Sequence, residues 1–403
     1  MRAQNALVVV QVGLAVVLLI ASGLMLRTFL SLRAVRPGFT HPEHIQTVRI
    51  FIPEVQIPAP ERVAQMQAEI LQGLAAIPGV TAAAFASGLP LEPDYHNGNP
   101  VFVEAKTPLA QIPPNRTLKQ ISPGYFAALG TRFIAGRDFT WDDLFGQRRV
   151  AILSENMARE YWGEARYALG KRIRVGTEGP WTEIVGVAEN IHEDGVDRLP
   201  PAMVYFHAGL QAPVQSGASP GVHRGVTFAI RSNRAATPGF LSQIAAVVHV
   251  VNPSLPLSEV RTLEDLYRIS IARRSFALIL LSITGVMALT LAVIGVYGVL
   301  AYAVAQRKRE MGIRVAVGAE PGAVKALFVR QGLMLACLGV LIGLGFSGAL
   351  SRWISSLLFG VTPLDPITYG LSGAVILAAA VTASYIPARR AAAADPMEAL
   401  RGD

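Results

Sequence analysis

Cysteine and nucleotide-binding motifs are nearly or wholly absent from this sequence. Its 403 residues include one cysteine, Cys337, so no intrachain disulfide can form and each domain must be held by its own core. The pattern G-x-x-x-x-G-K-[ST] occurs nowhere in the chain, so there is no P-loop to hold the phosphates of ATP. We identify no catalytic constellation and predict no metal or cofactor.

Charge is missing from four long stretches, which are the most informative part of the sequence. At about 1.5 Å per residue, a helix needs about 20 residues to cross a bilayer core of about 30 Å. Each stretch is long enough: residues 6–26, 275–305, 331–351 and 367–386. The first is also longer than the apolar region of about 7 to 15 residues in a signal peptide. We therefore predict four transmembrane helices, one before a long polar body and three after it.

Lys and Arg residues are unevenly distributed around these stretches. Segment 306–330 is rich in them, whereas segment 352–366 carries one Arg and one Asp. Because cytoplasmic loops are enriched in Lys and Arg, the first segment is predicted to be cytoplasmic and the second external. Both termini then lie in the cytoplasm, and the body lies in the periplasm or outside the cell. The Arg residues that flank the membrane externally oppose this rule, but long translocated domains are largely exempt from it. They are Arg27, Arg33, Arg273 and Arg274.

The composition fits an inner (plasma) membrane protein. Hydrophobic residues make up 52% of the chain, and its net charge is +8. Most of the positive excess lies at the membrane ends, so it indicates topology rather than nucleic-acid binding. The predicted surroundings of the four helices are membrane lipids.

The polar body has the pattern of a mixed α/β domain. Strand-like segments 45–52 and 80–86 flank a helical segment at 61–77, and a second β-α-β pattern covers 225–260. Two such units around an insertion at about 99–208 indicate a split, ferredoxin-like subdomain that carries a second subdomain. Within the insertion we expect strands at 116–121, 150–153, 171–175 and 182–187 and helices at 125–129 and 155–162.

The helices next to the body extend beyond the membrane. Thr262 and Asp265 form a helix start signal, and nothing between them and Ala305 breaks a helix. A 44-residue helix would span roughly 66 Å, about twice the bilayer core. The first helix can continue to Val35, before Pro37 and Gly38. We predict that both helices form a stalk; two ordinary crossings with short external loops are the alternative.

Several short motifs resemble the permease family of the macrolide exporter MacB and the cell-division protein FtsX. The resemblance covers nearly the whole chain, and the order of the motifs makes it specific. They are RKREMGIR at 307–314, AVGA at 316–319, SPGYF at 122–126, GRDF at 136–139, GKRI at 170–173, PARRA at 387–391 and DPMEAL at 395–400.

The resemblance implies the following organisation. Residues 1–36 would form the first helix and stalk, residues 37–261 a MacB-like external domain of the porter-and-sabre type, and residues 262–403 an FtsX-like permease domain. It also implies a homodimer or a paired second permease, driven by a separate ATP-binding cassette (ABC) protein. MacB carries its own ATPase domain, and this chain departs from that pattern.

The cytoplasmic segment after the second helix has two interpretations. Glu310 and Arg314 are an i, i+4 pair, worth only about 0.2 to 0.5 kcal/mol, on a short amphipathic helix. Composition alone favours a basic membrane anchor and a protein-docking helix equally. Similar permeases use this segment to dock into their ATPase, so the resemblance implies ATPase contacts along it. The residues chosen are Arg307, Arg309, Glu310, Met311, Gly312 and Arg314.

Two other patterns are assigned structural roles. Residues 343–348 spell G-x-G-x-x-G inside a membrane helix rather than after a strand, so dinucleotide binding is not expected. Gly339 and Gly343 form a G-x-x-x-G pair, which predicts close helix packing. His41 and His44 are three residues apart with Pro42 between them, and we interpret them as surface residues.

The function predicted is that of an ABC transporter permease subunit. ATP hydrolysis by a separate partner would move the external domain, by mechanotransmission, in the export or efflux of a substrate from the cell envelope. Membrane helices without charge disfavour an ion-coupled carrier. The alternative is an FtsX-like receptor or scaffold that regulates an envelope protein; a membrane-tethered enzyme is a third, weaker option. The sequence leaves open the cargo, the ATPase, the choice between homodimer and heterodimer, and whether the chain is half of a duplicated permease.

Overall fold

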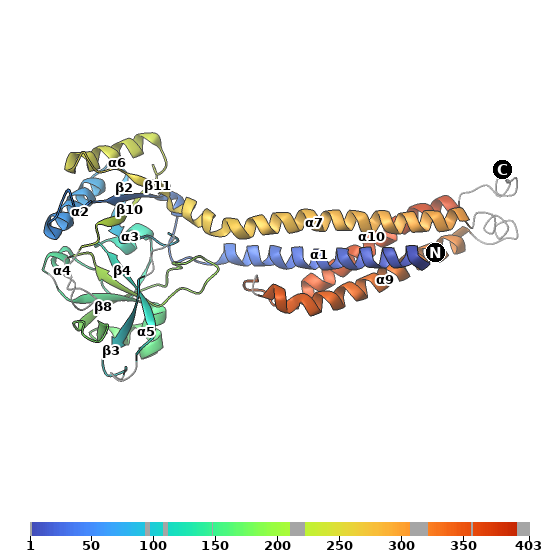
Figure 1. Ribbon diagram of the computed structural model, residues 1–403, viewed down its shortest axis with the longest axis horizontal. Helices are drawn as coiled ribbons and strands as arrows, with labels where there is room; N and C mark the ends of the chain where they lie inside the picture. Colours follow the sequence, from blue (N-terminus) through green and yellow to red (C-terminus); the bar gives the residue numbers. More distant parts are fainter. Residues whose placement is uncertain are drawn as a thin grey trace. The chain divides into compact units, whose positions relative to one another are not determined.

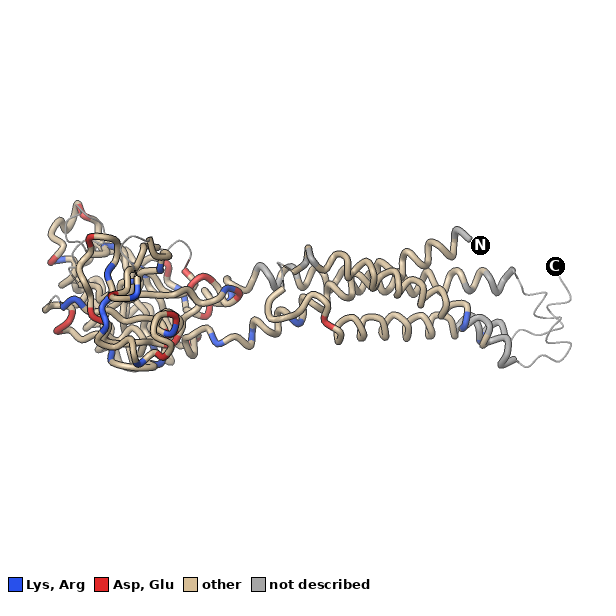
Figure 2. Tube along the Cα trace, turned by 90° about the horizontal axis from the view of Figure 1, so that it is seen from below, with Lys and Arg blue, Asp and Glu red and all other residues tan. Residues whose placement is uncertain are grey.

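The computed structural model describes residues 2–92, 97–107, 112–146, 148–209, 222–306, 321–355 and 358–392. The chain divides into two compact units. One contains residues 1–34 and 273–403, and the other contains residues 35–272. We call them the membrane unit and the external unit. Figure 2 shows that Lys, Arg, Asp and Glu are concentrated in the external unit, while long parts of the membrane-unit helices carry none.

The first part of the external unit is a ferredoxin-like sheet. Its strands are β1 (Ile45–Phe51), β2 (Val80–Ala86), β10 (Gly225–Ser232) and β11 (Ser258–Thr262), in the antiparallel order β11-β1-β10-β2. Helices α2 (Pro60–Ala75) and α6 (Pro238–Val251) lie together beside this part of the sheet (Figure 1). The two predicted β-α-β units are therefore confirmed as halves of one sheet.

The second part is a closed set of six strands. They follow β2 in the order β4-β3-β7-β8-β6-β9, and β9 also pairs in parallel with β4. Closure removes free edges from this sheet. The elements are β3 (Asn97–Val103), β4 (Asn115–Ile121), α3 (Tyr125–Leu129), β5 (Phe133–Gly136), α4 (Trp141–Phe145), β6 (Val150–Ser154), α5 (Glu155–Trp162), η2 (Ala165–Ala168), β7 (Arg172–Val175), β8 (Thr182–Ala188) and β9 (Met203–His207).

Five of these elements were absent from the expectation based on sequence: β3, β5, α4, η2 and β9. Each is seven residues or shorter, which is too short for a clear periodic signal. β9 is buried along its whole length, so it does not alternate between apolar and polar residues as a half-exposed strand does.

The two parts of the external unit are joined by one sheet contact. The described pairing between β2 and β4 is limited to Ala86 and Ile121. A hydrophobic core spans this junction and includes Tyr125, Phe126 and Tyr205 as well as Leu263 and Leu266. The start of the long helix α7 (Leu263–Gln306) is therefore buried in the external unit.

The membrane unit contains α1 (Arg2–Ala34), the later part of α7, α9 (Pro321–Ile354) and α10 (Pro366–Ala392). By length and composition, four segments can cross a membrane: Gln4–Ala34, Leu278–Val299, Val329–Ser351 and Pro366–Tyr385. The predicted continuity of α7 over 44 residues is confirmed. Its predicted start is also observed, since the Asp265 amide donates to Thr262 Oγ1 at 3.1 Å and the Thr262 amide to Asp265 Oδ2 at 2.9 Å.

Candidate functional site

The predicted ATPase-docking residues fall in segment 307–320, outside the described residues. This segment joins the end of α7 to the start of α9. The contacts chosen at Arg307, Arg309, Glu310, Met311, Gly312 and Arg314 remain predictions.

Helices α1 and α9 of the membrane unit approach each other closely at two glycines. A Cβ atom added to Gly339 would lie 2.6 Å from Val12 Cβ, and one added to Gly343 would lie 2.7 Å from Val16 Cβ. The Cβ added to Gly343 would also lie 2.8 Å from the backbone oxygen of Gly13 in α1. Any side chain at either position would collide with α1, so the glycines let the two backbones approach closely.

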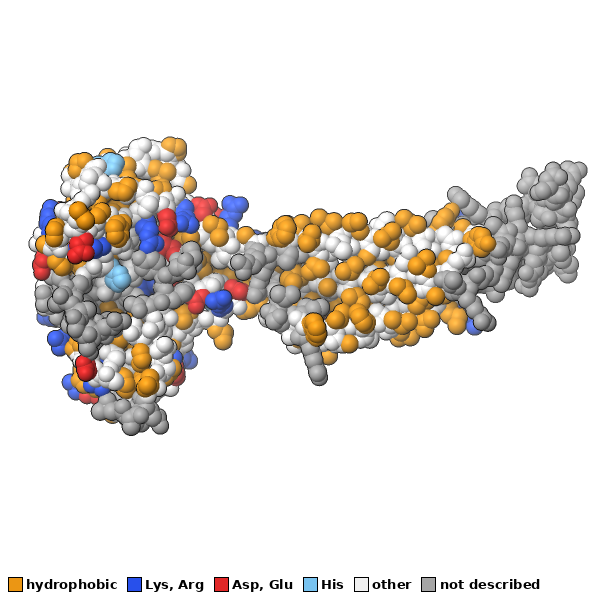
Figure 3. Space-filling view, viewed as in Figure 1, with side chains coloured by type: hydrophobic (Ala, Val, Ile, Leu, Met, Phe, Trp, Pro, Cys, Tyr) orange, Lys and Arg blue, Asp and Glu red, His pale blue; other side chains and the backbone are white. Residues whose placement is uncertain are grey.

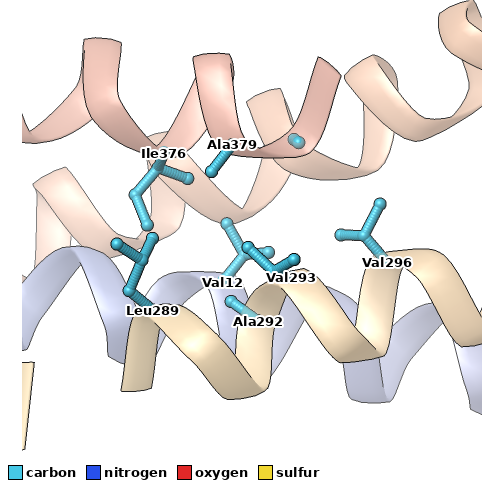
Figure 4. Close-up of a pocket in the computed structure, with 8 residues that line it drawn as sticks. Val12, Leu289, Ala292, Val293, Val296, Ile376 and Ala379 are labelled. Atoms are coloured by element: carbon cyan, nitrogen blue, oxygen red, sulfur yellow. The ribbon is translucent and has the colours of Figure 1, made fainter. Parts of the chain in front are cut away.

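The membrane unit contains a hydrophobic core. Val8, Val12, Ala15 and Val16 of α1 are buried against residues of α7, α9 and α10. A cavity between α1, α7 and α10 has about 10 Å³ of open space, at the lower limit for one water molecule. Val12, Leu289, Val293 and Ile376 point toward it (Figure 4). This cavity has no room for a transported molecule.

The end of α1 is attached to the start of α10 by polar contacts. Arg27 forms an ion pair with Asp365, and Asp365 Oδ2 accepts hydrogen bonds from the amide and hydroxyl of Thr368 at 2.8 and 2.6 Å. Asp365 thereby caps α10, as an acidic group at a helix N-terminus does favourably. Sequence reasoning missed this site, although Asp365 three residues before Thr368, followed by Pro366, is a helix start signal.

Much of the outward surface of the membrane unit is hydrophobic (Figure 3). On α7, the exposed apolar side chains include Ile279, Ile283, Val286, Met287 and Ile294. An apolar surface of this extent is stable against lipid tails or another apolar surface, but not against water. The part of α7 in this unit is packed on one side, where Ala292 and Val296 are buried.

A buried ionic cluster occupies the junction of the external unit. Lys119 and Glu193 form an ion pair in which their side chains are 3% and 4% exposed. Glu92 accepts a hydrogen bond from the Leu89 amide at 2.9 Å and one from Thr227 Oγ1 at 3.2 Å. Burial raises the pKa of Glu92 above its usual range, although these hydrogen bonds and Arg49 favour the charged form.

Two tyrosines belong to the same junction. Burial raises the pKa of both Tyr125 and Tyr205 well above the usual value, and the charge of Glu193 adds to this effect. Their hydroxyl oxygens and Glu193 Oε1 have no hydrogen-bond partner among the described residues. Buried polar groups are normally hydrogen-bonded, so these three atoms are exceptions in the external unit.

Comparison with known families decides the identity of these two units. The family model of the MacB-like periplasmic core domain matches residues 6–244, and that of the FtsX-like permease C-terminal region matches residues 282–396. The chain belongs to the MacB/FtsX family of ABC transporter permeases. The resemblance inferred from short motifs is confirmed, as is a fold with four apolar helices and a large external α/β domain. This MacB/FtsX permease is thus a membrane protein with an external domain.

Individual relatives are distant. The permease is 29% identical over 292 residues to the macrolide export ATP-binding/permease protein MacB of Chromobacterium violaceum, covering 71% of this chain and 43% of that protein. It is 24% identical over 341 residues to the ABC transporter permease YknZ of Bacillus subtilis, covering 82% and 78%. The chain therefore spans less than half the length of the C. violaceum relative.

Among solved structures, the periplasmic region of MacB from Actinobacillus actinomycetemcomitans matches 59% of this chain and 97% of that structure. The sequence identity is 12% and the TM-score is 0.35.

Proposed function

We propose that this permease couples ATP hydrolysis by a separate ATPase to movement of its external unit, in the export or efflux of a substrate from the cell envelope. One observation carries the proposal: α7 is a single helix whose first residues are buried in the external core and whose later residues belong to the membrane unit. We propose that a displacement of its membrane part is passed to the external unit along this helix.

The length of α7 suits this role. Its 44 residues give a length of roughly 66 Å, about twice the bilayer core. A continuous helix bends far less than a loop. Proline is a common cause of sharp kinks in helices, and α7 contains no proline. The opposite end of α7 leads into segment 307–320, which we propose to dock the ATPase on the cytoplasmic side.

The source of energy is proposed to be another protein. The C. violaceum relative is named as an ATP-binding and permease protein in one, whereas this sequence contains no P-loop. The proposed orientation places both termini and segment 307–320 in the cytoplasm of a cell with the permease in its inner membrane. The cavity between α1, α7 and α10 is too small for cargo, so it offers no support for conduction through the helices.

The apolar surface of α7 bears on the assembly. Side chains such as Ile283, Met287 and Ile294 are more than half exposed. We propose that part of this surface meets lipid and part meets a second permease, either another copy or a paired chain.

The coupling proposal is tested by substitution in the docking segment. Glu310→Ala and Arg314→Ala each remove a charged contact, and we expect binding to the ATPase to weaken about tenfold or more, equivalent to about 1.4 kcal/mol. The full chain would be extracted in detergent, its ATPase captured by pull-down, and ATP hydrolysis measured with wild type and each variant. Insertion in the membrane should be unchanged.

Glu320→Ala is the matched control, because it removes an acidic residue of the same segment outside the chosen contacts. We expect it to keep the stimulation of ATP hydrolysis. Equal stimulation by wild type and by the Glu310 and Arg314 variants would contradict the docking contacts. Failure of any ABC ATPase to bind the wild-type chain, with or without nucleotide, would overturn the proposed function itself.

A further inference from the structure

Three potential metal ligands lie together at the start of the external unit. His41, Glu43 and His44 each offer one donor atom, and these atoms all lie within 4.8 Å of one another. His41 Nδ1 is 3.2 Å from Glu43 Oε1, and the two imidazole rings are stacked with centroids 5.6 Å apart. The sequence spacing was interpreted as two surface histidines, because a shared face of an α-helix was excluded.

The local backbone explains why that interpretation missed the cluster. Residues Pro42–His44 form a 3-10 turn, and His41 before it has a left-handed backbone with φ 49° and ψ 58°. A left-handed conformation is uncommon for residues other than glycine, although histidine, asparagine and aspartate are enriched among the exceptions. This conformation directs the chain so that His41 meets the side chains of the turn that follows it. The short motif H-P-E-H was the available sequence signal.

The frame around the cluster is fixed on both sides. Before it, the Thr40 amide donates to Leu129 O at 2.9 Å, Thr131 Oγ1 donates to Gly38 O at 2.6 Å, and Arg231 Nη2 donates to Thr40 O at 2.8 Å. After it, β1 begins at Ile45 and pairs with β10 and β11. The ligands are thus presented by a turn whose two ends are anchored to the same unit, which reduces the ordering needed on binding.

We propose that His41, Glu43 and His44 form a binding site for a divalent transition-metal ion of the Zn²⁺ or Cu²⁺ class. Two imidazoles and one carboxylate are a ligand set that these ions accept. With bonds of about 2.0 to 2.2 Å, tetrahedral ligand atoms lie roughly 3.3 to 3.6 Å apart, close to the His41–Glu43 separation. The His41 and Glu43 side chains are 68% and 45% exposed, so they are free to make the remaining adjustment.

At this place the ion would cross-link three side chains of one turn. It would tie His41 to the turn at Pro42–His44, and so brace the segment that leads from α1 into β1. Three protein ligands leave a fourth position for water. Glu43 supplies the negative charge of the site, and the positive charge of Arg231 is close enough to interact with it. Burial lowers the pKa of Arg231, whereas the charge of Glu43 raises it.

The test uses the full chain in detergent, purified with a tag that contains no histidine and stripped of metal with a chelator. Calorimetric titration with ZnCl₂ above about pH 7, where protons compete little for imidazole, should show one site per chain. In metal sites, removing a residue that only hydrogen-bonds to a ligand lowers the affinity for the metal about 10- to 100-fold, and removing a ligand should lower it more. We therefore expect His41→Asn combined with His44→Ala to weaken binding by at least about 100-fold.

Two choices keep the result interpretable. Asparagine at position 41 tolerates the left-handed backbone, so a loss of binding reflects lost ligands rather than unfolding, which circular dichroism would check. His249→Ala is the matched control, because His249 is exposed on α6 and outside the cluster. With CuCl₂, the electron paramagnetic resonance spectrum should show two nitrogen ligands in wild type and not in the double variant.

Zn²⁺ should also raise the melting temperature of wild type but not of the double variant, because an ion that binds only the folded state stabilises it. Equal binding by wild type and the double variant, or an equal loss in His249→Ala, would mean adventitious binding only and would overturn the site. Both outcomes are independent of whether an ATPase partner binds.

Discussion

Lys119 and Glu193 show how single residues set the geometry of the external unit. Both side chains are almost fully buried. Removing a charged group from water costs several kcal/mol per ion, and only close pairing with an opposite charge offsets this cost. The pair joins β4 to the segment after β8, next to the single strand contact between the two parts of the sheet. Because both residues belong to the closed set of six strands, the pair fastens the segment after β8 within the second part.

Lys119→Met should destabilise the chain strongly, because it leaves Glu193 as a buried charge without its partner. Breaking such a pair costs about 3 to 5 kcal/mol, which at about 2 to 4 °C per kcal/mol lowers the melting temperature by about 6 to 20 °C. Thermal unfolding of the detergent-solubilised chain measures this. The control is Arg132→Met, whose ion pair with Glu189 has side chains 73% and 28% exposed; it should cost under about 1 kcal/mol. Equal shifts for both variants would refute the role given to burial.

Asp143 makes the stability of the external unit depend on acid pH. Its hydrogen bonds to Arg137 and Thr140 outweigh burial and lower its pKa from 3.8 to about 2. A carboxyl with a lowered pKa stabilises the fold above its unfolded value, and this contribution is lost as pH falls from about 4 to about 2. Because Arg137 is 45% exposed and partly screened, we expect about 1 to 2 kcal/mol rather than the full shift.

The difference in melting temperature between wild type and Asp143→Asn should therefore shrink as pH is lowered from 5 to 2. Asp142→Asn is the control, since Asp142 is its exposed neighbour in the same helical turn; its effect should stay within about 0.5 kcal/mol. A difference for Asp143→Asn that stays constant with pH would rule out this linkage.

At the scale of elements, the membrane unit is organised around α1. This helix packs against α9 through glycines, is attached to α10 by Asp365 and contacts α7 through Ser22 Oγ, which donates to Leu281 O at 2.7 Å. Van der Waals packing, rather than the hydrophobic effect, holds helices together in lipid. Close approach at the glycines is thus a main source of stability for this unit.

Gly343→Leu should separate α1 from α9, because even its Cβ would lie 2.7 Å from Val16 Cβ. Overpacking of this kind typically costs about 1 to 3 kcal/mol, and we expect a lower melting temperature and more aggregation on size-exclusion chromatography in detergent. Gly345→Leu is the matched control two residues further along α9, where an added Cβ meets nothing within 4 Å among the described residues. If both variants behave alike, the glycine contact is not what holds these helices.

At the scale of the whole molecule, α7 runs from the external unit into the membrane unit, and segment 307–320 is proposed to dock a partner protein. The proposed coupling depends on the continuity of α7. The Glu310 and Arg314 variants test the proposed docking of the ATPase at the end of this helix. The family models match residues 6–244 and 282–396 and so cover both units. We therefore propose a function for the whole chain rather than for either unit alone.

The sequence alone determined the elements with strong local signals. Long charge-free runs, the Thr262–Asp265 start signal and the two β-α-β patterns predicted the four helices, the length of α7 and the ferredoxin-like sheet, because hydrophobic periodicity and capping are local properties. Family resemblance followed from short motifs in a fixed order. The pair Gly339 and Gly343 pointed to close packing, but the sequence did not name α1 as the helix that receives it.

Only the tertiary structure decided the features that depend on distant residues. The closure of β9 onto β4, the Lys119–Glu193 pair and the attachment of Arg27 to Asp365 all require a particular backbone path. Lys119 and Glu193 are 74 positions apart in the sequence, and Arg27 and Asp365 lie in the regions of the first and last helices of the membrane unit. No local sequence pattern encodes contacts between such distant residues. Packing brings these groups together, and their chemistry then follows from burial and distance.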